Sequence, residues 1–583
     1  MEEGDIYRVL AGSDLILNLN AYRGLQIIDF SDVANPKIIG DLRVSGTPVE
    51  MYSVGDRVYV LMNNWRGYWG SREDVAVDTF HGGIVLAIDV SDRTNPVITG
   101  QATIPGNIRT SRLTRGNGEE ALFVVTNEWN TSTTYVQSYS VSSGGRLAAK
   151  SRIDLDTEGY LTDIQASPEL LMVARWDWNQ RGQGSEVSLI DISNPNGTMV
   201  EGATIRASGF VEKKTNMDHD GDIVRIVSGN DWSNQTNTNH VQTFNVADIT
   251  NPVPVDAETF GDGENLYATI FVEEKAFFVT YRRVDPFHAF SIDATGQIEE
   301  KSEFIVSGWN DFFKPVSANK RLIGIGYNDE NGTRDLSVSL YDIEDLVNPN
   351  PLVDREGVEL QWGWSEATWD DRAFTVLEKG TSVMAGDVLE TGLVLLPFSG
   401  WDGDGYTSGV QIFTFSETSL TRRGLMVHGT PVRRSFEADD GLTANLSEAE
   451  LSLFGTSDAA NPVAHGRVEL APNYTDVLVF GDYAARVNQK SDYYYGWYTA
   501  EEPPASIVEI IPRSAHPDTA VAVSSVEVPA NAQLYAAGDQ LVAVTTTVLD
   551  WNVYPYQYET RVRTFDLSDP TVPVAATATS ATT

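Results

Sequence analysis

The chain has no cysteine among its 583 residues. Disulfides, thiolate zinc sites and cysteine nucleophiles are therefore excluded. Basic residues are scarce as well: 41 Lys and Arg stand against 82 Asp and Glu, a formal net charge of −41. Such a charge repels nucleic acid and anionic membranes, so we expect neither as a partner. Long apolar runs are also missing, so we expect no membrane insertion.

What the chain does contain favours an all-β protein. Hydrophobic residues make up 41% of it, aromatic residues 10%, and there are 48 glycines. Apolar stretches of alternating pattern are short and are separated by turn residues, which is typical of β-strands. Only residues 447–451 have the pattern of a short helix.

One unit recurs along the chain. A strand runs into a turn rich in Asp, Ser, Asn and Pro, and another strand follows, as in 85–96 (VLAIDVSDRTNP), 241–252 (VQTFNVADITNP) and 562–573 (VRTFDLSDPTVP). The turn has a local cause, because Asp and Ser side chains cap their own backbone and Asn-Pro favours an extended residue. Four short strands in each unit of roughly fifty residues predict four-stranded antiparallel blades of a β-propeller.

About eleven such units can be counted, which exceeds the usual ring of four to eight blades. We therefore expect either one large ring with extra blades or two rings. The copies become less regular late in the chain, and we place a boundary at 465/466. Residues 1–465 are then the propeller region, and residues 466–583 are additional propeller-like blades that complete or join the ring.

Tryptophan is concentrated in one kind of connection. If the strands of a blade are lettered a to d, antiparallel order puts the b–c loops and the d–a connections at one end and the a–b and c–d turns at the other. Eleven of the thirteen tryptophans fall in connections assigned to the b–c end. The residues predicted to bind a ligand there are Trp65, Trp69, Trp129, Trp176, Trp178, Trp232, Trp309, Trp364, Trp497 and Trp551, with Glu128, Asp177 and Asp231 beside them.

Aromatic rings in polar loops suit a binding surface, because they supply contact area at a low entropic cost while amides and carboxylates add directed hydrogen bonds. The sequence favours a non-catalytic propeller that binds a glycan or protein ligand. Three alternatives stay open. The tryptophans could instead fill the gaps between blades, carboxylates on this face could make the protein a hydrolase or lyase acting on polysaccharide or peptide, or the chain could be a structural module of the cell envelope.

A metal site is predicted at residues 218–222 (DHDGD), where carboxylates alternate around a glycine. Asp218, Asp220 and Asp222 offer the oxygen ligands that calcium prefers, and a solvated turn is the competing interpretation. The seven histidines are scattered and form no His-x-x-x-His pair, so we do not expect a zinc enzyme.

Four stretches resemble the β-propeller-domain family of secreted bacterial proteins, a largely uncharacterised group distantly similar to WD-type propellers. They are 2–6 (EEGDI), 285–326, 366–374 with its Glu-Ala-Thr and Asp-Arg-Ala-Phe segments, and 432–435 (VRRS). The resemblance implies the propeller fold and an exported location, secreted or at the cell envelope, with a leader absent from this chain. It implies no particular activity.

Overall fold

The structure is a computed structural model of the 583-residue chain. It describes residues 1–582 apart from residues 22, 45, 64–81, 117–118, 129–130, 156–158, 178–182, 230–237, 282–284, 307, 329–334, 348–349, 403–404, 472–473, 489–504, 516–519, 530–531, 550–556 and 577–578. In the described residues, the helical elements are the short 3₁₀ turns η2 (Lys214–Asn216) and η4 (Glu366–Thr368). No helix in this part of the chain has the length and apolar content to cross a bilayer.

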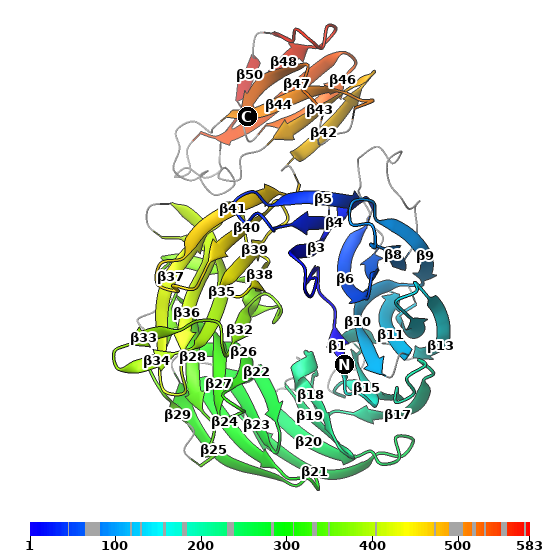
Figure 1. The fold of residues 1–583 in the computed structure, drawn as a ribbon, viewed down its shortest axis with the longest axis vertical. Helices are drawn as coiled ribbons and strands as arrows, with labels where there is room; N and C mark the ends of the chain where they lie inside the picture. The colour runs from blue at the N-terminus through cyan, green and yellow to red at the C-terminus, as the bar shows by residue number, and fades with distance from the viewer. Residues whose placement is uncertain are drawn as a thin grey trace.

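The described residues form eleven sheets of four or five strands and one two-stranded hairpin. All pairings between neighbouring strands are antiparallel, which confirms the all-β propeller architecture with about eleven repeats. The first nine sheets are arranged as blades around a ring (Figure 1).

Blades one to three contain β2 (Tyr7–Val9), β3 (Leu15–Asn20), β4 (Gly24–Asp29), β5 (Lys37–Leu42); β6 (Thr47–Val54), β7 (Arg57–Asn63), β8 (Gly83–Asp89), β9 (Val97–Ile104); and β10 (Asn107–Gly116), β11 (Glu119–Glu128), β12 (Thr133–Val141), β13 (Leu147–Leu155). Blades four to six contain β14 (Tyr160–Ala166), β15 (Leu170–Trp176), β16 (Glu186–Asp191), β17 (Val200–Arg206); β18 (Met217–Asp220), β19 (Ile223–Ser228), β20 (Asn239–Asn245), β21 (Val253–Phe260); and β22 (Asn265–Val272), β23 (Lys275–Tyr281), β24 (Asp285–Ile292), β25 (Ile298–Val306).

Blades seven to nine contain β26 (Trp309–Val316), β27 (Arg321–Asn328), β28 (Asp335–Asp342), β29 (Asn350–Pro351), β30 (Glu356–Gly357); β31 (Trp362–Trp364), β32 (Thr375–Leu377), β35 (Gly392–Trp401), β36 (Tyr406–Phe415), β37 (Leu420–Val427); and β38 (Arg434–Asp439), β39 (Leu442–Leu446), β40 (Glu450–Gly455), β41 (Val463–Glu469). The eighth blade also contains the hairpin β33 (Val383–Ala385) and β34 (Val388–Glu390). The final two sheets contain β42 (Tyr474–Phe480), β43 (Tyr483–Asn488), β44 (Ala505–Pro512), β45 (Ser524–Pro529); and β46 (Gln533–Ala537), β47 (Gln540–Val548), β48 (Tyr558–Asp566), β49 (Val574–Ala575), β50 (Thr579–Thr582).

The helix predicted at 447–451 is wrong, because residues 447–449 form the turn between β39 and β40 and residues 450–451 begin β40. The Ser447 hydroxyl accepts hydrogen bonds from the backbone amides of Ala449 and Glu450. A serine that caps a tight turn in this way favours a hairpin over a helix.

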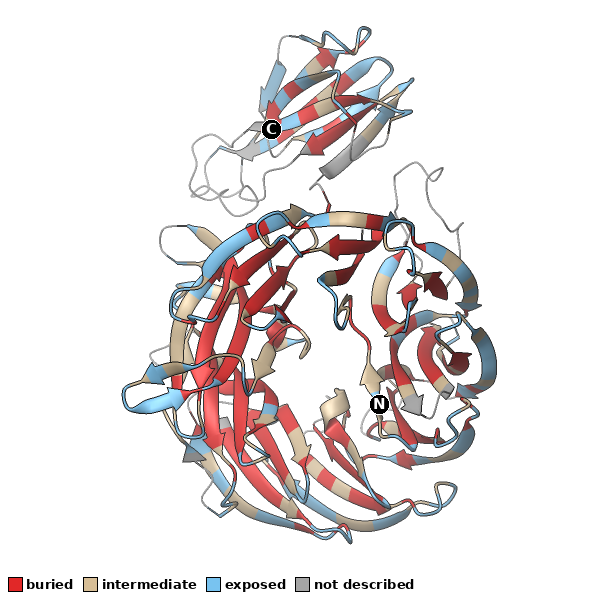
Figure 2. Ribbon diagram, in the orientation of Figure 1, coloured by how far each residue is buried: buried red, intermediate tan, exposed pale blue. Residues whose placement is uncertain are grey.

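The ring closes between its first and ninth blades. Ile16 and Ile28 of the first blade share a buried cluster with Phe436 and Leu446 of the ninth, and the Tyr7 and Phe436 rings stack with centroids 3.7 Å apart. A buried cluster also fills each of the other junctions between consecutive blades. The core is therefore divided among the gaps between blades, and burial falls toward the outermost strands (Figure 2).

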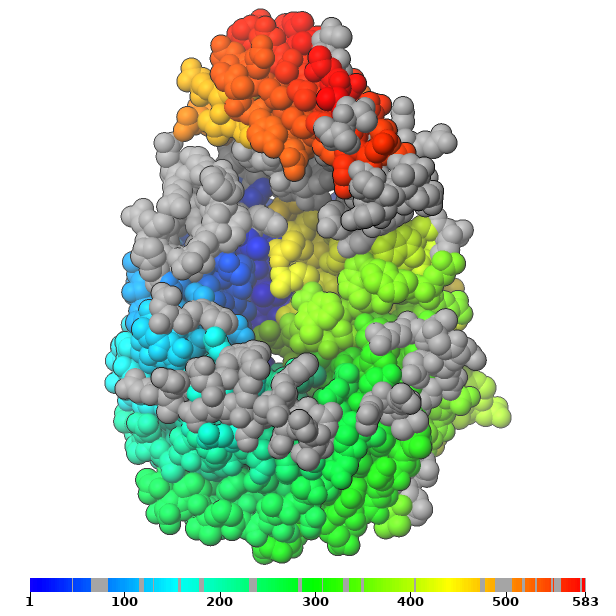
Figure 3. Space-filling model, turned by 180° about the vertical axis from the view of Figure 1, so that it is seen from behind, coloured from blue at the N-terminus to red at the C-terminus, as the bar shows by residue number. Residues whose placement is uncertain are grey.

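The last two sheets pack on each other through a separate cluster that includes Val508, Ile510, Leu541 and Phe565. They lie beyond the rim of the ring (Figure 1), and the surfaces of the first and ninth blades lie side by side below them (Figure 3). The arrangement is one ring with extra blades. The predicted boundary at 465/466 falls inside β41, and the first of the extra sheets begins with β42.

The recurring turns join strands c and d of each blade, as the sequence predicts. In the first blade, Asp29 accepts hydrogen bonds from the amide and hydroxyl of Ser31, and Asp32 accepts from the amide of Ala34. These hydrogen bonds hold the pKa of Asp29 below its ordinary value, because they stabilise the carboxylate form.

Candidate functional site: the axial pocket

The innermost strands surround a pocket of about 290 Å³, here called the axial pocket. Most of its lining residues are charged. They come from six blades and from the N-terminal segment: Glu3, Glu50, Arg109, Thr110, Asp163, Lys213, Lys214, Thr215, Phe312, Trp369, Asp370, Asp371 and Arg372.

A repeated backbone irregularity places several of these side chains. The first strand of a blade has a register shift in β6, β10, β14 and β26, and the residues that resume pairing after it are Glu50, Thr110, Asp163 and Phe312. A bulge of this kind re-aims the side chain that follows it. Each is the fourth residue of its strand, so the pocket lies roughly 10 Å from the end at which strand b ends and strand c begins.

The N-terminal segment crosses the ring interior to reach this pocket. β1 (Glu2–Glu3) pairs with β10 of the third blade, although the first blade begins only at Tyr7. Asp5 bridges to Met51 of the second blade, and the Gly4 carbonyl accepts a hydrogen bond from Arg372. The segment therefore supplies one wall of the pocket.

Buried ion pairs join this segment to two distant stretches, and we call the group the axial ion-pair network. Arg434 contacts Asp5 at 2.9 Å, Asp370 at 2.6 Å and Glu366 at 3.4 Å. Arg372 in turn pairs with Asp370 at 3.0 Å and Glu50 at 3.3 Å. The network therefore joins residues 2–6, 366–374 and 432–435, three of the stretches behind the family resemblance.

Burial and the neighbouring arginines shift the pKa values of these carboxyls in opposite directions. Burial raises the pKa of Asp370, but Arg434 and Arg372 outweigh it and hold the pKa well below its ordinary value. Glu50 is fully enclosed, and there burial dominates and raises the pKa in spite of Arg372. Paired carboxylates such as Asp370 are poorly suited to proton transfer, because their charge is already neutralised by fixed arginines.

Two cations of the pocket, Arg109 and Lys213, differ from Lys214 in their ion pairing. Lys214 is paired with Glu3 at 2.7 Å and with Asp371 at 2.9 Å. Among the described residues, Arg109 and Lys213 have no carboxylate within ion-pair distance, and the Lys213 ammonium lies 4.8 Å from the centre of the Phe312 ring. The loop that carries Lys213 is held by Asn216, whose amide oxygen accepts hydrogen bonds from the Glu212 and Lys213 backbone.

An exposed aromatic ring completes the pocket. Trp369 follows η4 and is 63% exposed, although it lines the cavity. An indole held open to solvent beside two unpaired cations offers an apolar contact surface next to positive charge. This arrangement suits a ligand that combines a flat apolar face with an anionic group.

Asp311 lies next to the pocket, in the bulge of β26. It is 8% exposed, and its Oδ2 atom has no hydrogen-bond partner among the described residues. Burial raises the pKa of Asp311 to about 7, although the charges of Lys213 and Arg355 and a hydrogen bond from Trp309 act in the opposite direction.

An aromatic cluster occupies the b–c end of the eighth blade. Trp362 pairs across the strands with Trp401, and Trp401 pairs with Tyr406, with ring centroids 5.4 and 5.6 Å apart. Trp364 contacts Trp362 at 5.2 Å, and Trp362 is 58% exposed. Trp401 is not among the residues predicted from sequence to line the binding face. Its position at the end of strand b is the sequence signal that would have placed it there.

The predicted binding residues divide into three groups. Trp176 and Trp309 end or begin strands and are buried, so they are not on an open surface: Trp309 packs on Tyr267, Tyr281 and Tyr327 between blades six and seven. This is the gap-filling role left open by the sequence. Trp364, Glu128 and Asp177 are half-buried at the b–c end. Trp65, Trp69, Trp129, Trp178, Trp232, Trp497, Trp551 and Asp231 lie outside the described residues.

The predicted calcium residues lie at the turn between β18 and β19. Asp218 forms an ion pair with Arg225, and Asp220 lies 3.9 Å from the same guanidinium. In the described residues, the group of three side chains whose ligand atoms converge is elsewhere, at His288, Glu300 and Glu303. Calcium binding at residues 218–222 stays a prediction, and it would have to compete with Arg225.

Fold and pocket together define a β-propeller with a charged axial cavity. The family model described as "Beta propeller domain" matches residues 16–445, and the chain belongs to this family. The chain is similar to an uncharacterized protein of Methanocaldococcus jannaschii, at 32% identity over 20% of this chain and 18% of that protein. An uncharacterized protein of Archaeoglobus fulgidus is 29% identical over 20% of this chain and 17% of its own length. The match thus spans less than a fifth of either relative.

Proposed function

We propose that this protein is a non-catalytic binding propeller whose axial pocket takes the acidic group of a glycan, with aromatic side chains contacting the sugar rings. The observation that carries the proposal is the pair of unpaired cations, Arg109 and Lys213, beside the open indole of Trp369. Arg109 is exposed and Lys213 is half-buried. In a chain of net charge −41, two cations without a carboxylate within ion-pair distance leave positive charge in the pocket that an anionic ligand can pair with.

The aromatic cluster supports a glycan over a small free anion. Trp362, Trp364, Trp401 and Tyr406 lie at the b–c end of the ring, the end at which the tryptophan-bearing loops emerge. A chain of sugars could extend from the pocket toward this end, since exposed rings give contact area without a large loss of conformational entropy.

The test compares an oligogalacturonate with its methyl-esterified, neutral form by isothermal titration. We expect the wild type to bind the acidic oligosaccharide at least tenfold more tightly than the ester. The double variant Arg109→Gln/Lys213→Gln should lose that preference, because each charge-assisted hydrogen bond contributes about 1.5–3 kcal/mol. The matched control is Lys150→Gln/Lys314→Gln, which removes two exposed cations and the same net charge.

Three results would contradict the proposal: equal affinity for acid and ester, unchanged binding by the pocket variant, or equal losses in both double variants. Tighter binding of polyglutamate than of oligogalacturonate would assign the pocket to an acidic protein ligand instead.

A hydrolase is the second candidate, and one observation favours it. The raised pKa of Asp311 is what a general acid needs near neutral pH. Release of new reducing ends from the oligosaccharide, abolished in Asp311→Asn, would replace the binding proposal with this one.

A further inference from the structure

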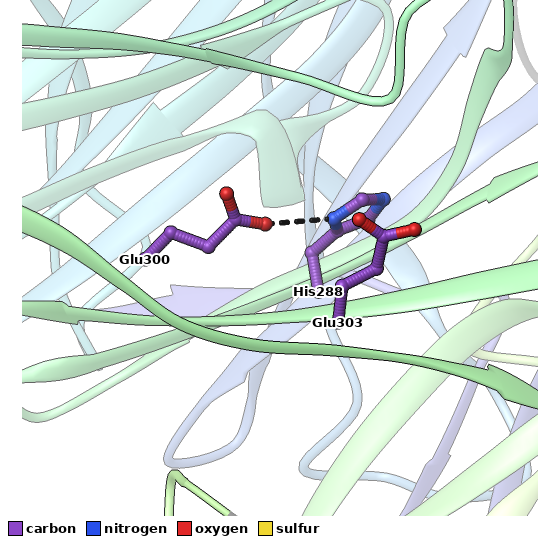
Figure 4. Close-up of side chains that lie close together, drawn as sticks. All are labelled: His288, Glu300 and Glu303. Carbon is purple, nitrogen blue, oxygen red and sulfur yellow. Dashed lines mark hydrogen bonds and ion pairs between the residues drawn. The ribbon is translucent and has the colours of Figure 1, made fainter.

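A histidine and two glutamates converge at the outer part of the sixth blade, away from the axial pocket. Ligand atoms of His288 on β24 and of Glu300 and Glu303 on β25 all lie within 4.8 Å of one another. His288 is 1% exposed, while both glutamates are exposed. Figure 4 shows the three side chains close together.

A bulge creates the convergence. Residues three apart on a regular strand point to opposite faces, so Glu300 and Glu303 would normally be separated by the sheet. The pairing shifts register between Ala289 and Phe290, so that Ser302 and Glu300 are consecutive partners and Lys301 is the extra residue. Both carboxylates consequently share the face of His288.

The hydrogen bonds around His288 fix its tautomer. The Thr280 hydroxyl donates its only proton to the Glu264 carboxylate at 2.5 Å. Its contact with the other ring nitrogen, His288 Nε2 at 3.1 Å, must therefore have Nε2–H as donor and the hydroxyl as acceptor. In a neutral ring, Nδ1 is then the nitrogen with the lone pair.

That lone pair faces a carboxylate. Nδ1 lies 3.0 Å from Glu300 Oε1, and Glu303 lies directly across the strands from His288. Two acceptors this close need a proton or a metal ion between them. Lys301 does not serve, because it pairs with Glu299.

We propose that His288, Glu300 and Glu303 bind a divalent transition-metal ion of the zinc type. One neutral imidazole nitrogen and two carboxylate oxygens are ligands that zinc accepts, and their charges balance a 2+ ion. A tetrahedral site has ligand atoms roughly 3.4 Å apart, so small rotations of the exposed glutamates would bring the three side chains to three of its four positions, with water at the fourth. Thr280 and Glu264 supply the outer hydrogen bonds that typically orient a metal-binding histidine. This proposal is independent of ligand binding in the axial pocket.

The experiment is isothermal titration of the full chain with zinc chloride, with millimolar calcium present to occupy acidic loops. We expect one zinc ion per chain, bound with micromolar affinity or tighter. The double variant Glu300→Gln/Glu303→Gln should bind at least tenfold more weakly, whereas Glu299→Gln, on the same strand and also exposed, should bind like the wild type. Cobalt substitution should give the visible absorption of a tetrahedral site with nitrogen and oxygen ligands.

Failure to bind zinc, or zinc binding that is equal in the double variant and the wild type, would overturn the proposal. Circular dichroism on each variant separates loss of the metal site from loss of the fold.

Discussion

Replacing Asp311 with asparagine should stabilise the protein at alkaline pH and not at acidic pH. Asp311 is buried, and burial raises its pKa from an ordinary value of 3.8 to about 7. Between these two values the folded chain holds a proton that the unfolded chain has released. The contribution of Asp311 to the free energy of unfolding therefore falls as the pH rises from about 4 to 7. The asparagine side chain has a similar shape and never ionises, so it avoids this penalty.

The size of the effect follows from the two pKa values. Each pKa unit corresponds to about 1.4 kcal/mol. Integrating over the titration, the stability of Asp311→Asn relative to the wild type should increase by about 2.5 kcal/mol between pH 5 and pH 8. Using the difference between two pH values cancels any change in packing that the substitution causes.

The assay is urea unfolding followed by tryptophan fluorescence, at pH 5 and pH 8 and at constant ionic strength. Asp354→Asn, at an exposed position close to Arg355, is the control and should show no such difference. A variant whose relative stability is the same at both pH values would refute the assignment of a neutral carboxyl to Asp311, and a loss at pH 8 would show that its charge is stabilising.

Three further results are expected. Arg434→Met should lower the free energy of unfolding by about 3–5 kcal/mol in urea titrations, because Asp5 would lose its guanidinium partner and Asp370 would keep only Arg372. A loss below 1 kcal/mol would show that the axial ion-pair network is dispensable. Gly184→Ala should destabilise the protein far more than Gly538→Ala. Both glycines have positive φ, but the added Cβ would lie 1.9 Å from the Ala207 carbonyl oxygen at position 184 and in open space at position 538. Equal melting temperatures of the two variants would contradict this prediction. A chain that ends at Ala471 should retain the melting transition of the ring, because the last two sheets have a core of their own, and an unfolded product would show that the ring depends on them.

The sequence predicted only part of where the tryptophans lie. Antiparallel order correctly put the b–c loops at one end, because this follows from alternation alone. The order of the strands does not distinguish a tryptophan at the tip of a loop from one at the first or last residue of a strand. Trp176 and Trp309 fall within strands, where a large ring fills the space between blades. Burial depends on the neighbouring blade, which the local pattern does not contain.

The sequence by itself determined the strands, their c–d turns and the approximate number of blades. Each of these depends on residues close together in the chain: alternation with a period of two, and Asp or Ser side chains that bond to their own backbone. Only the tertiary structure decided that nine blades close the ring and that two sheets stay outside it, since closure depends on how Ile16 and Phe436 pack. It also decided both sites. The axial pocket joins Glu3, Lys214 and Arg372, and the proposed zinc site needs a single bulge residue to turn Glu300 and Glu303 to the same face. Contacts between such distant residues, and one-residue shifts in register, have no counterpart in local sequence pattern.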